Sequence, residues 1–117
     1  MNPRRYLRQG MIVLGLILAG VVPGSAFAAE IYGRVWDGSS NRPLVGASMV
    51  TDCSDGETTD RYGLYRLQVS KTDIECNLSL IYRDKESTSL RIYVTSRRTL
   101  VDIEVRPGRE RWVLVRR

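Results

Sequence analysis

The chain has 117 residues, which is enough for one domain at most. It contains 18 lysines and arginines, 13 aspartates and glutamates, two cysteines and no histidine. The lack of histidine excludes zinc sites and hydrolytic sites that depend on imidazole ligands or imidazole bases. The formal net charge of +5 alone would suggest an anionic partner such as nucleic acid, but the way this charge is distributed argues against it.

Residues 1–28 have the three-part layout of a secretory signal peptide. Arg4, Arg5 and Arg8 precede an apolar run from Met11 to Val22, and small residues then lead to a cleavage site after Ala28. The apolar run is shorter than the roughly 20 residues that a membrane span needs. We therefore expect export by the general route, a periplasmic or secreted mature protein, and no membrane span in the mature chain. An uncleaved membrane anchor is the competing interpretation.

Removal of residues 1–28 changes the charge balance. Three basic residues are lost and no acidic ones, so the mature chain carries 15 basic and 13 acidic residues and a net charge of +2. We therefore expect no nucleic-acid partner. The remaining excess lies in residues 106–117, which include five arginines and one glutamate.

Cys53 and Cys76 are the two cysteines of the chain. An even number of cysteines in an exported protein indicates a disulfide. The loop closed by this pair would stabilise a small domain by about 3 kcal/mol. Two alternatives stay open, namely a metal site, which would need further ligands, and a pair of reduced thiols of which one is reactive.

Seven segments alternate apolar and polar residues with the period of two that is typical of half-buried strands. They are residues 30–37, 46–51, 62–69, 75–82, 88–94, 99–105 and 111–115. Because the connections are too short for helices, we predict mostly antiparallel pairing. Two sheets stacked on their apolar faces would form a β-sandwich over residues 29–105, which becomes seven-stranded with the segment at 111–115. Residues 106–117 are predicted to form either a last strand or a basic arm.

Asp60 stands just before the predicted strand at 62–69, and Gly63 is the second residue of that segment, in the stretch TTDRYGLYRL. An aspartate side chain can accept hydrogen bonds from backbone N–H groups one to three residues further on, and glycine tolerates left-handed backbone. A catalytic aspartate would need a partner such as a histidine, a second carboxylate or a metal. We therefore interpret Asp60 and Gly63 as structural turn residues.

Three short motifs of the chain resemble the carboxypeptidase regulatory-like domain, a transthyretin-like (prealbumin-like) β-sandwich found on metallocarboxypeptidases and on many bacterial envelope proteins. The matching residues are Ile31, Gly33 and Val35; Pro43, Leu44, Gly46, Ala47 and Met49; and Thr59, Asp60, Gly63, Tyr65 and Leu67. The resemblance covers about residues 30–105. It implies a transthyretin-like fold in a free-standing exported protein, but no particular function. The cysteine pair and the arginine-rich end depart from the family pattern.

Catalysis is not expected from these residues. Lys71 and Lys85 lie in polar turns, where burial would not lower the pKa of an amine enough to make it a base. We predict no catalytic residues, no cofactor and no metal. A hydrolase is the least favoured interpretation, after the two binding functions described next. The pair Arg97-Arg98 is interpreted as solubilising turn residues.

Two binding functions remain. The first is interaction with a protein partner at the bacterial cell envelope, through edge strands and through outward aromatic side chains at Tyr32, Trp36 and Tyr93. The alternative is a binder of anionic glycan or lipid that uses the arginine-rich end. Its predicted contact residues are Arg106, Arg109, Arg111, Trp112, Arg116 and Arg117.

Overall fold

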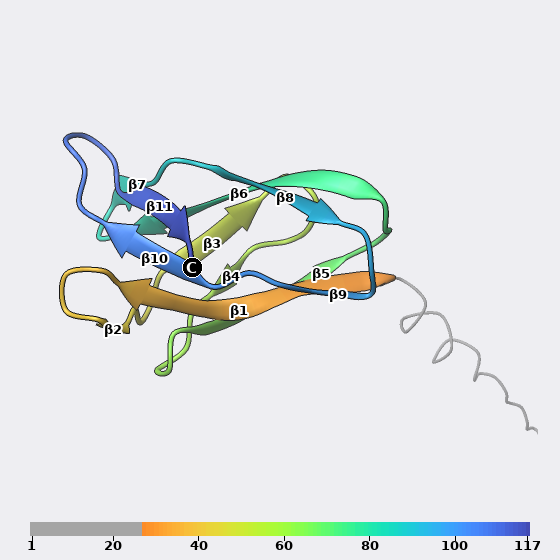
Figure 1. The fold of residues 1–117 in the computed structure, drawn as a ribbon, viewed down its shortest axis with the longest axis horizontal. Coiled ribbons are helices and arrows are strands. Elements are labelled where there is room, and N and C mark those ends of the chain that lie inside the picture. Colours follow the sequence, from red (N-terminus) through yellow and green to blue (C-terminus); the bar gives the residue numbers. More distant parts are fainter. Residues whose placement is uncertain (1–26) are drawn as a thin grey trace, which may run out of the picture.

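The computed structural model describes residues 27–117, which form eleven strands in two sheets (Figure 1). The strands are β1 (Ala29–Asp37), β2 (Arg42–Pro43), β3 (Ser48–Thr51), β4 (Glu57–Thr58), β5 (Leu64–Val69), β6 (Ile74–Tyr82), β7 (Lys85–Glu86), β8 (Leu90–Val94), β9 (Arg98–Leu100), β10 (Ile103–Arg106) and β11 (Val113–Arg116). The sheets face each other with the apolar core between them.

Strand β1 is the centre of the first sheet. Along one side it pairs antiparallel with β5 and, further on, with β2. Along the other side it pairs parallel with β9 and then β10, and β11 pairs antiparallel with β10. Tyr32 lies opposite Leu100 and Val35 opposite Ile103, so β9 and β10 follow β1 in one register, as a single interrupted strand.

Strand β6 is the centre of the second sheet, in which all pairs are antiparallel. It pairs with β3 on one side, and β4 lies outside β3. On the other side it pairs with β8 and β7. The β6–β7 hairpin turns at Arg83 and Asp84, whose φ angles of 52° and 60° are those of a two-residue type I′ turn.

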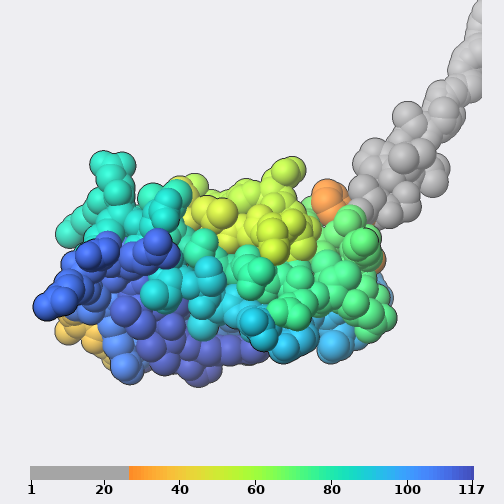
Figure 2. Space-filling view, turned by 90° about the horizontal axis from the view of Figure 1, so that it is seen from above, coloured from red at the N-terminus to blue at the C-terminus, as the bar shows by residue number. Residues whose placement is uncertain are grey.

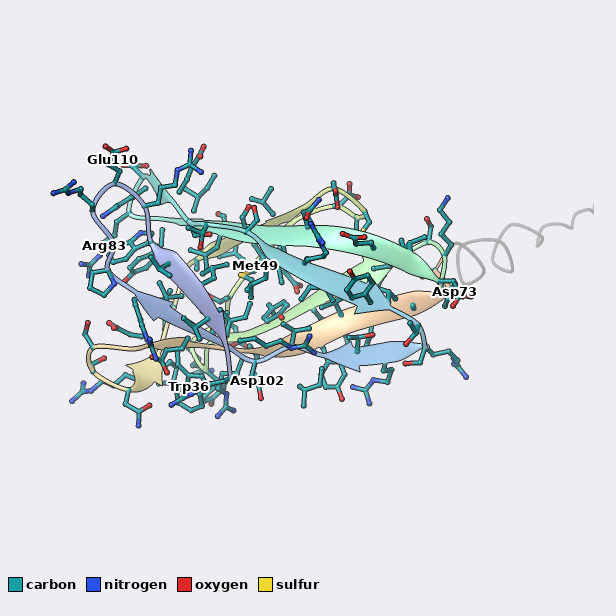
Figure 3. The ribbon with its side chains drawn as sticks, turned by 45° about the horizontal axis from the view of Figure 1, so that its top comes forward. Trp36, Met49, Asp73, Arg83, Asp102 and Glu110 are labelled. Carbon is teal, nitrogen blue, oxygen red and sulfur yellow. A yellow bond between two sulfur atoms is a disulfide. The ribbon has the colours of Figure 1, made fainter. Side chains whose placement is uncertain are left out.

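The core follows from the alternation of each strand. In β1, β5, β6 and β8 every second residue points into the core. These inward residues are buried, except at some strand ends where they are half-buried, and the residues between them point outward. Figure 3 shows Met49 of β3 between the two sheets. The largest fully buried side chains are Ile31, Met49, Leu67, Leu78, Leu80, Ile92, Ile103, Val35, Val69, Val94, Val101 and Cys76.

The predicted all-β class with mostly antiparallel sheets is confirmed. The described residues form eleven strands rather than seven, for two reasons. Three added pieces, β2, β4 and β7, are two residues long and too short to show an alternating pattern. The strand predicted at 99–105 is interrupted between β9 and β10, where side chains replace part of the backbone ladder.

Residues 106–117 end in a strand and not in a free arm. Beyond its pairing with β10, this segment is joined to the second sheet near β7. The Trp112 N–H donates to the Glu86 carbonyl (2.9 Å), the Thr88 N–H donates to the Trp112 carbonyl (2.8 Å), and the Leu114 N–H donates to Thr88 Oγ1 (3.0 Å). Figure 2 shows this C-terminal segment, in blue, lying against the residues coloured cyan. The sandwich is therefore closed at this side.

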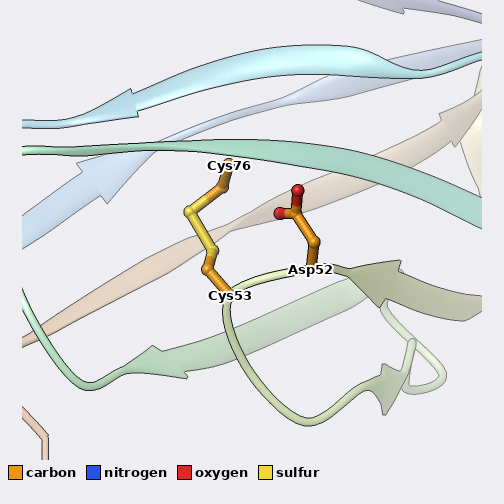
Figure 4. A group of neighbouring side chains, drawn as sticks. All are labelled: Asp52, Cys53 and Cys76. Carbon is orange, nitrogen blue, oxygen red and sulfur yellow. A yellow bond between two sulfur atoms is a disulfide. The ribbon is translucent and has the colours of Figure 1, made fainter.

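The predicted disulfide between Cys53 and Cys76 is confirmed (Figure 4). It ties the loop after β3 to Cys76, near the start of β6, with a Cα–Cα distance of 5.8 Å. The Asp52 carboxylate fastens the same loop, because it accepts from the N–H (3.0 Å) and Nδ2 (3.1 Å) of Asn77. These hydrogen bonds from Asn77 lower the pKa of Asp52.

The predicted signal peptide lies outside the described residues, except for Phe27 and Ala28. The Ala28 N–H donates to the Val69 carbonyl at the start of the first sheet (3.0 Å). Within residues 27–117 no helix is long and apolar enough to cross a membrane. A disulfide agrees with an oxidising compartment.

Candidate functional site

The outer face of the first sheet carries a shallow groove of about 620 Å³. Outward residues of three strands line it: Tyr32, Arg34 and Trp36 of β1, Leu64 and Arg66 of β5, and Arg98 and Leu100 of β9. We call these seven residues the arginine–aromatic face. Trp36 and Asp102, labelled in Figure 3, both line this groove.

Guanidinium groups lie over the aromatic rings of this face. Arg98 lies 4.1 Å from the centroid of the Tyr32 ring. Arg34 and Arg117 lie 5.1 Å and 4.8 Å from the centroid of Trp36. Each contact has cation–π geometry, which holds the guanidinium plane near the ring and leaves its outer edge free to donate hydrogen bonds.

Three of these arginines have carboxylate partners. Glu30 is shared by Arg98 at 3.0 Å and Arg66 at 3.8 Å. Arg117 lies 3.7 Å from Glu104 and donates to Asn41 Oδ1 at 2.7 Å. Exposed pairs of this kind stabilise a protein little, but they hold the side chains in place at the two ends of the groove.

Arg34 differs from the other arginines of the face. Within residues 27–117 its guanidinium forms no ion pair, and its Nε atom is buried without a hydrogen-bond partner. The Asp102 carboxylate borders the same groove, and its Oδ1 accepts from the backbone N–H of Arg34 (3.0 Å) rather than from the guanidinium. The centre of the groove therefore carries a guanidinium that forms no ion pair among residues 27–117.

Below Arg34, at the floor of the groove, the backbone hydrogen-bond ladder between β1 and the β9–β10 strand is interrupted. The Val101 carbonyl turns into the core over Gly33, where an added Cβ would lie only 2.1 Å from the oxygen. The Tyr65 hydroxyl donates to this carbonyl (2.6 Å). Burial, with a smaller contribution from the charge of Asp102, raises the pKa of Tyr65, so this hydroxyl stays protonated and remains a donor.

Asp60 borders the groove and forms a turn. Its Oδ1 accepts from the N–H groups of Tyr62 (2.8 Å) and Leu64 (2.9 Å), and its carbonyl accepts from Gly63 (2.9 Å). Gly63 has a φ of 76°, in the left-handed region, and a Cβ there would meet the Val35 carbonyl at 2.6 Å. This geometry is the turn role that the sequence suggests for Asp60 and Gly63.

The three aromatic residues predicted to bind a partner do not lie together. Tyr32 and Trp36 project from the outer face of the first sheet. Tyr93 of β8 projects from the second sheet and is 58% exposed. A single flat partner therefore cannot contact all three residues.

The residues predicted to bind a polyanion are also dispersed. Arg106 pairs with Glu104 (2.5 Å), Arg116 donates to the Leu100 carbonyl (2.9 Å), and Arg117 lies over Trp36. Arg109 and Arg111 are exposed in the loop before β11.

Trp112 is half-buried where the C-terminal segment meets the β6–β7 hairpin. Its ring lies 5.9 Å from that of Tyr82, and its Nε1 donates to the Tyr82 carbonyl (2.9 Å). Lys85 Nζ lies 4.7 Å from the Trp112 ring. The geometry gives Trp112 a packing role here.

Sequence reasoning missed Arg34, Arg66 and Arg98 as members of a site. Arg98 was assigned to a solubilising turn, whereas it lies in β9 and stacks on Tyr32. One signal was present in the stretch from Tyr32 to Trp36, because Arg34 stands between two aromatic residues at the outward positions of a strand. The contribution of β5 and β9 had no local signal.

Among residues 27–117, Asp52, Cys53 and Cys76 form a group of potential metal ligands within 4.8 Å (Figure 4). Both sulfur atoms are joined in the disulfide, and Asp52 is occupied by Asn77. An oxidised pair offers no thiolate to a metal. We therefore do not assign a metal site to this group.

Comparison of the chain with models of known protein families and with curated proteins gives no match to either. The resemblance to the carboxypeptidase regulatory-like domain thus stays a prediction.

Proposed function

We propose that the protein is a non-catalytic binding module of the bacterial cell envelope, which holds a protein partner on the arginine–aromatic face. The observation that carries this proposal is the composition of that face. Arginine, tyrosine and tryptophan, which dominate the binding energy of protein interfaces, lie together around one groove. Leu64 and Leu100 in the same groove are 40% and 51% exposed and offer apolar contact area.

The acidic groups around the groove support binding rather than catalysis. Asp60 accepts from two turn N–H groups, Asp102 accepts from the N–H of Arg34, and Glu57 accepts from the N–H of Arg66. A general base needs a carboxylate that is free to take a proton from a substrate. These three carboxylates have a structural task instead.

The outer face is a better contact surface than the strand edges. At β5, the outward backbone of Leu64 is bonded to Asp60, and the outward N–H of Arg66 to the Glu57 side chain. At β11, the outward N–H of Leu114 is bonded to Thr88. Groups that are already paired cannot accept a partner strand, so strand addition at these positions is disfavoured.

The export of the protein belongs to the same proposal. It is supported by the signal-peptide layout of residues 1–28 and by the disulfide between Cys53 and Cys76. Binding of an anionic glycan or lipid through the C-terminal arginines stays the alternative. It is less favoured because those arginines do not form one patch.

Site-specific photocrosslinking in the native cells tests the proposal. A photoreactive residue would replace Leu100 on the arginine–aromatic face or, as a matched control, Tyr93 on the opposite sheet. We expect one discrete protein adduct from position 100 and none from position 93. Trp36→Ala should weaken the binding free energy for the captured partner by about 2 kcal/mol, as for a hot-spot residue, whereas Tyr93→Ala should leave it unchanged. Equal adducts from both positions would argue against this face.

A further inference from the structure

The central cation of the groove is the strongest indication of a ligand. The guanidiniums of Arg66, Arg98 and Arg117 have Glu30 or Glu104 nearby, but that of Arg34 has no carboxylate partner among residues 27–117. A partly buried charge without a partner is unfavourable, because it has lost water and gained no counter-ion. An incoming anion would therefore gain most at Arg34.

The surroundings of Arg34 select the kind of anion. A guanidinium held beside an aromatic ring, as Arg34 is beside Trp36, presents a fixed row of N–H groups that fits a carboxylate with two parallel hydrogen bonds. Phosphate fits the same N–H groups. The exposed side chains of Leu64 and Leu100 in the same groove, however, offer apolar contact that a peptide can use and a phosphate polymer cannot.

The cations also lie along one strand. The guanidinium of Arg98 lies at Tyr32, and those of Arg34 and Arg117 both lie at Trp36, two outward positions further along β1. Outward positions of a strand are about 6.6–6.8 Å apart. An extended peptide laid along β1 repeats its own side chains at this distance, so acidic side chains at alternate positions could reach the cations at both Tyr32 and Trp36.

We propose that the arginine–aromatic face binds an extended acidic segment of its protein partner, with one carboxylate on Arg34. The flanking acidic side chains of the segment lie near Arg98 and Arg117, where they compete with Glu30 and Glu104. This inference rests on the proposed function of the face and adds the chemistry of the partner to it.

Fluorescence anisotropy with a labelled peptide of alternating threonine and glutamate tests this proposal. The control peptide carries glutamine in place of glutamate. We expect the glutamate peptide to bind the protein at least about tenfold more tightly than the control peptide, as for hydrogen bonds between charged groups. Equal binding of the two peptides would overturn the proposal.

Arg34→Gln should weaken binding of the glutamate peptide about tenfold or more. The matched control is Arg91→Gln, an exposed arginine of the second sheet that pairs with Glu75 at 2.6 Å, and it should change affinity less than about twofold. Arg34→Lys keeps the charge but loses the paired N–H groups, so we expect a loss between these two. A thermal melt verifies folding, and Arg34→Lys serves as the test if Arg34→Gln does not fold.

Equal effects of Arg34→Gln and Arg91→Gln would overturn the proposal, since they indicate non-specific attraction. Polyphosphate that binds more tightly than the peptide and depends on Arg109 and Arg111 would also overturn it in favour of a polyanion ligand. Photocrosslinking at position 100 separates the two levels of inference. If the Arg34→Gln variant still forms the adduct from position 100 at full yield, the acidic segment is refuted but the protein partner is not. If the unchanged protein binds the glutamate peptide but forms no adduct in cells, the proposed protein partner is refuted.

Discussion

The two sheets hold their central strands by different means. Strand β6 is paired with β3 and β8 in continuous antiparallel ladders, and a disulfide holds it at Cys76, near its start. Strand β1 is paired with β5, β2, β9 and β10, and its ladder to the β9–β10 strand is interrupted at Val101 and Asp102. At this interruption the Tyr65 hydroxyl and the Asp102 carboxylate take over hydrogen bonds of the backbone.

The difference shows where the shape of the groove comes from. In the second sheet, continuous backbone ladders and the disulfide hold the strands, and Asp52 fastens the loop after β3 to Asn77. In the first sheet, Gly33, Tyr65 and Asp102 hold the backbone beneath Arg34. Substitutions at these three positions should therefore alter both the stability of the fold and the groove.

The largest effect is expected for Gly33→Ala. The added Cβ would meet the Val101 oxygen at 2.1 Å, and this oxygen is held by the Tyr65 hydroxyl, so the strands must separate. We expect a loss of about 4 kcal/mol or more in the free energy of unfolding, measured by urea denaturation. Gly46→Ala is the control, since Gly46 has open space but a φ of 78°, and should lose about 1–2 kcal/mol.

Loss of the disulfide should have the next largest effect. The double variant Cys53→Ala/Cys76→Ala frees the loop after β3 from β6, and we expect it to lose about 3 kcal/mol. Since 1 kcal/mol corresponds to roughly 4–8 °C in a domain of this size, the melting temperature should fall by more than about 10 °C. An unchanged melting temperature would show that the second sheet does not depend on this bond.

Tyr65→Phe tests the side-chain support of the first sheet. The substitution leaves the Val101 carbonyl without its donor in a buried place, which should lower the free energy of unfolding by about 1–3 kcal/mol. Tyr62→Phe, at a tyrosine that is 55% exposed, should change it by less than about 0.5 kcal/mol. Equal effects of the two substitutions in denaturant titrations would contradict the role of the Tyr65 hydroxyl.

The smallest effect is expected for the loss of stability at low pH that comes from protonation of Asp52. Hydrogen bonds from Asn77 hold the pKa of Asp52 below its ordinary value of 3.8. The ionised form therefore adds stability that is fully present above that value and is lost as the pH falls through the lower pKa of the folded state. Melting temperatures of the protein and of Asp52→Asn should converge below pH 4, and a difference that persists in stronger acid would count against this account.

The sequence predicts the local part of the structure well. Alternation at Ile31 and Val35, or at Leu78 and Leu80, shows which side chains are buried, because it depends only on neighbours along one strand. The disulfide follows from the even cysteine count together with the predicted export of the chain. The motif around Asp60 holds its own turn within four residues, so a short stretch of sequence contains all the partners.

The candidate site could be predicted only in part. Tyr32, Arg34 and Trp36 share a face within one strand, and that much is visible in the sequence. The stacking of Arg98 on Tyr32 and the bond from Arg34 to Asp102 depend on pairing between segments 68 residues apart. Alternation does not report which strands are neighbours, so these contacts had no sequence signal.

The parallel pairing of β1 with β9 and β10 has a consequence for how the chain folds. The second sheet and its disulfide are built wholly from residues between 48 and 94, so they can assemble from segments that are close along the chain. Strand β1 precedes the other described strands along the chain but lacks its partners on one side until residues 98–106 have followed. Because distant pairings form slowly, we expect β1 to be among the last strands to be fully paired.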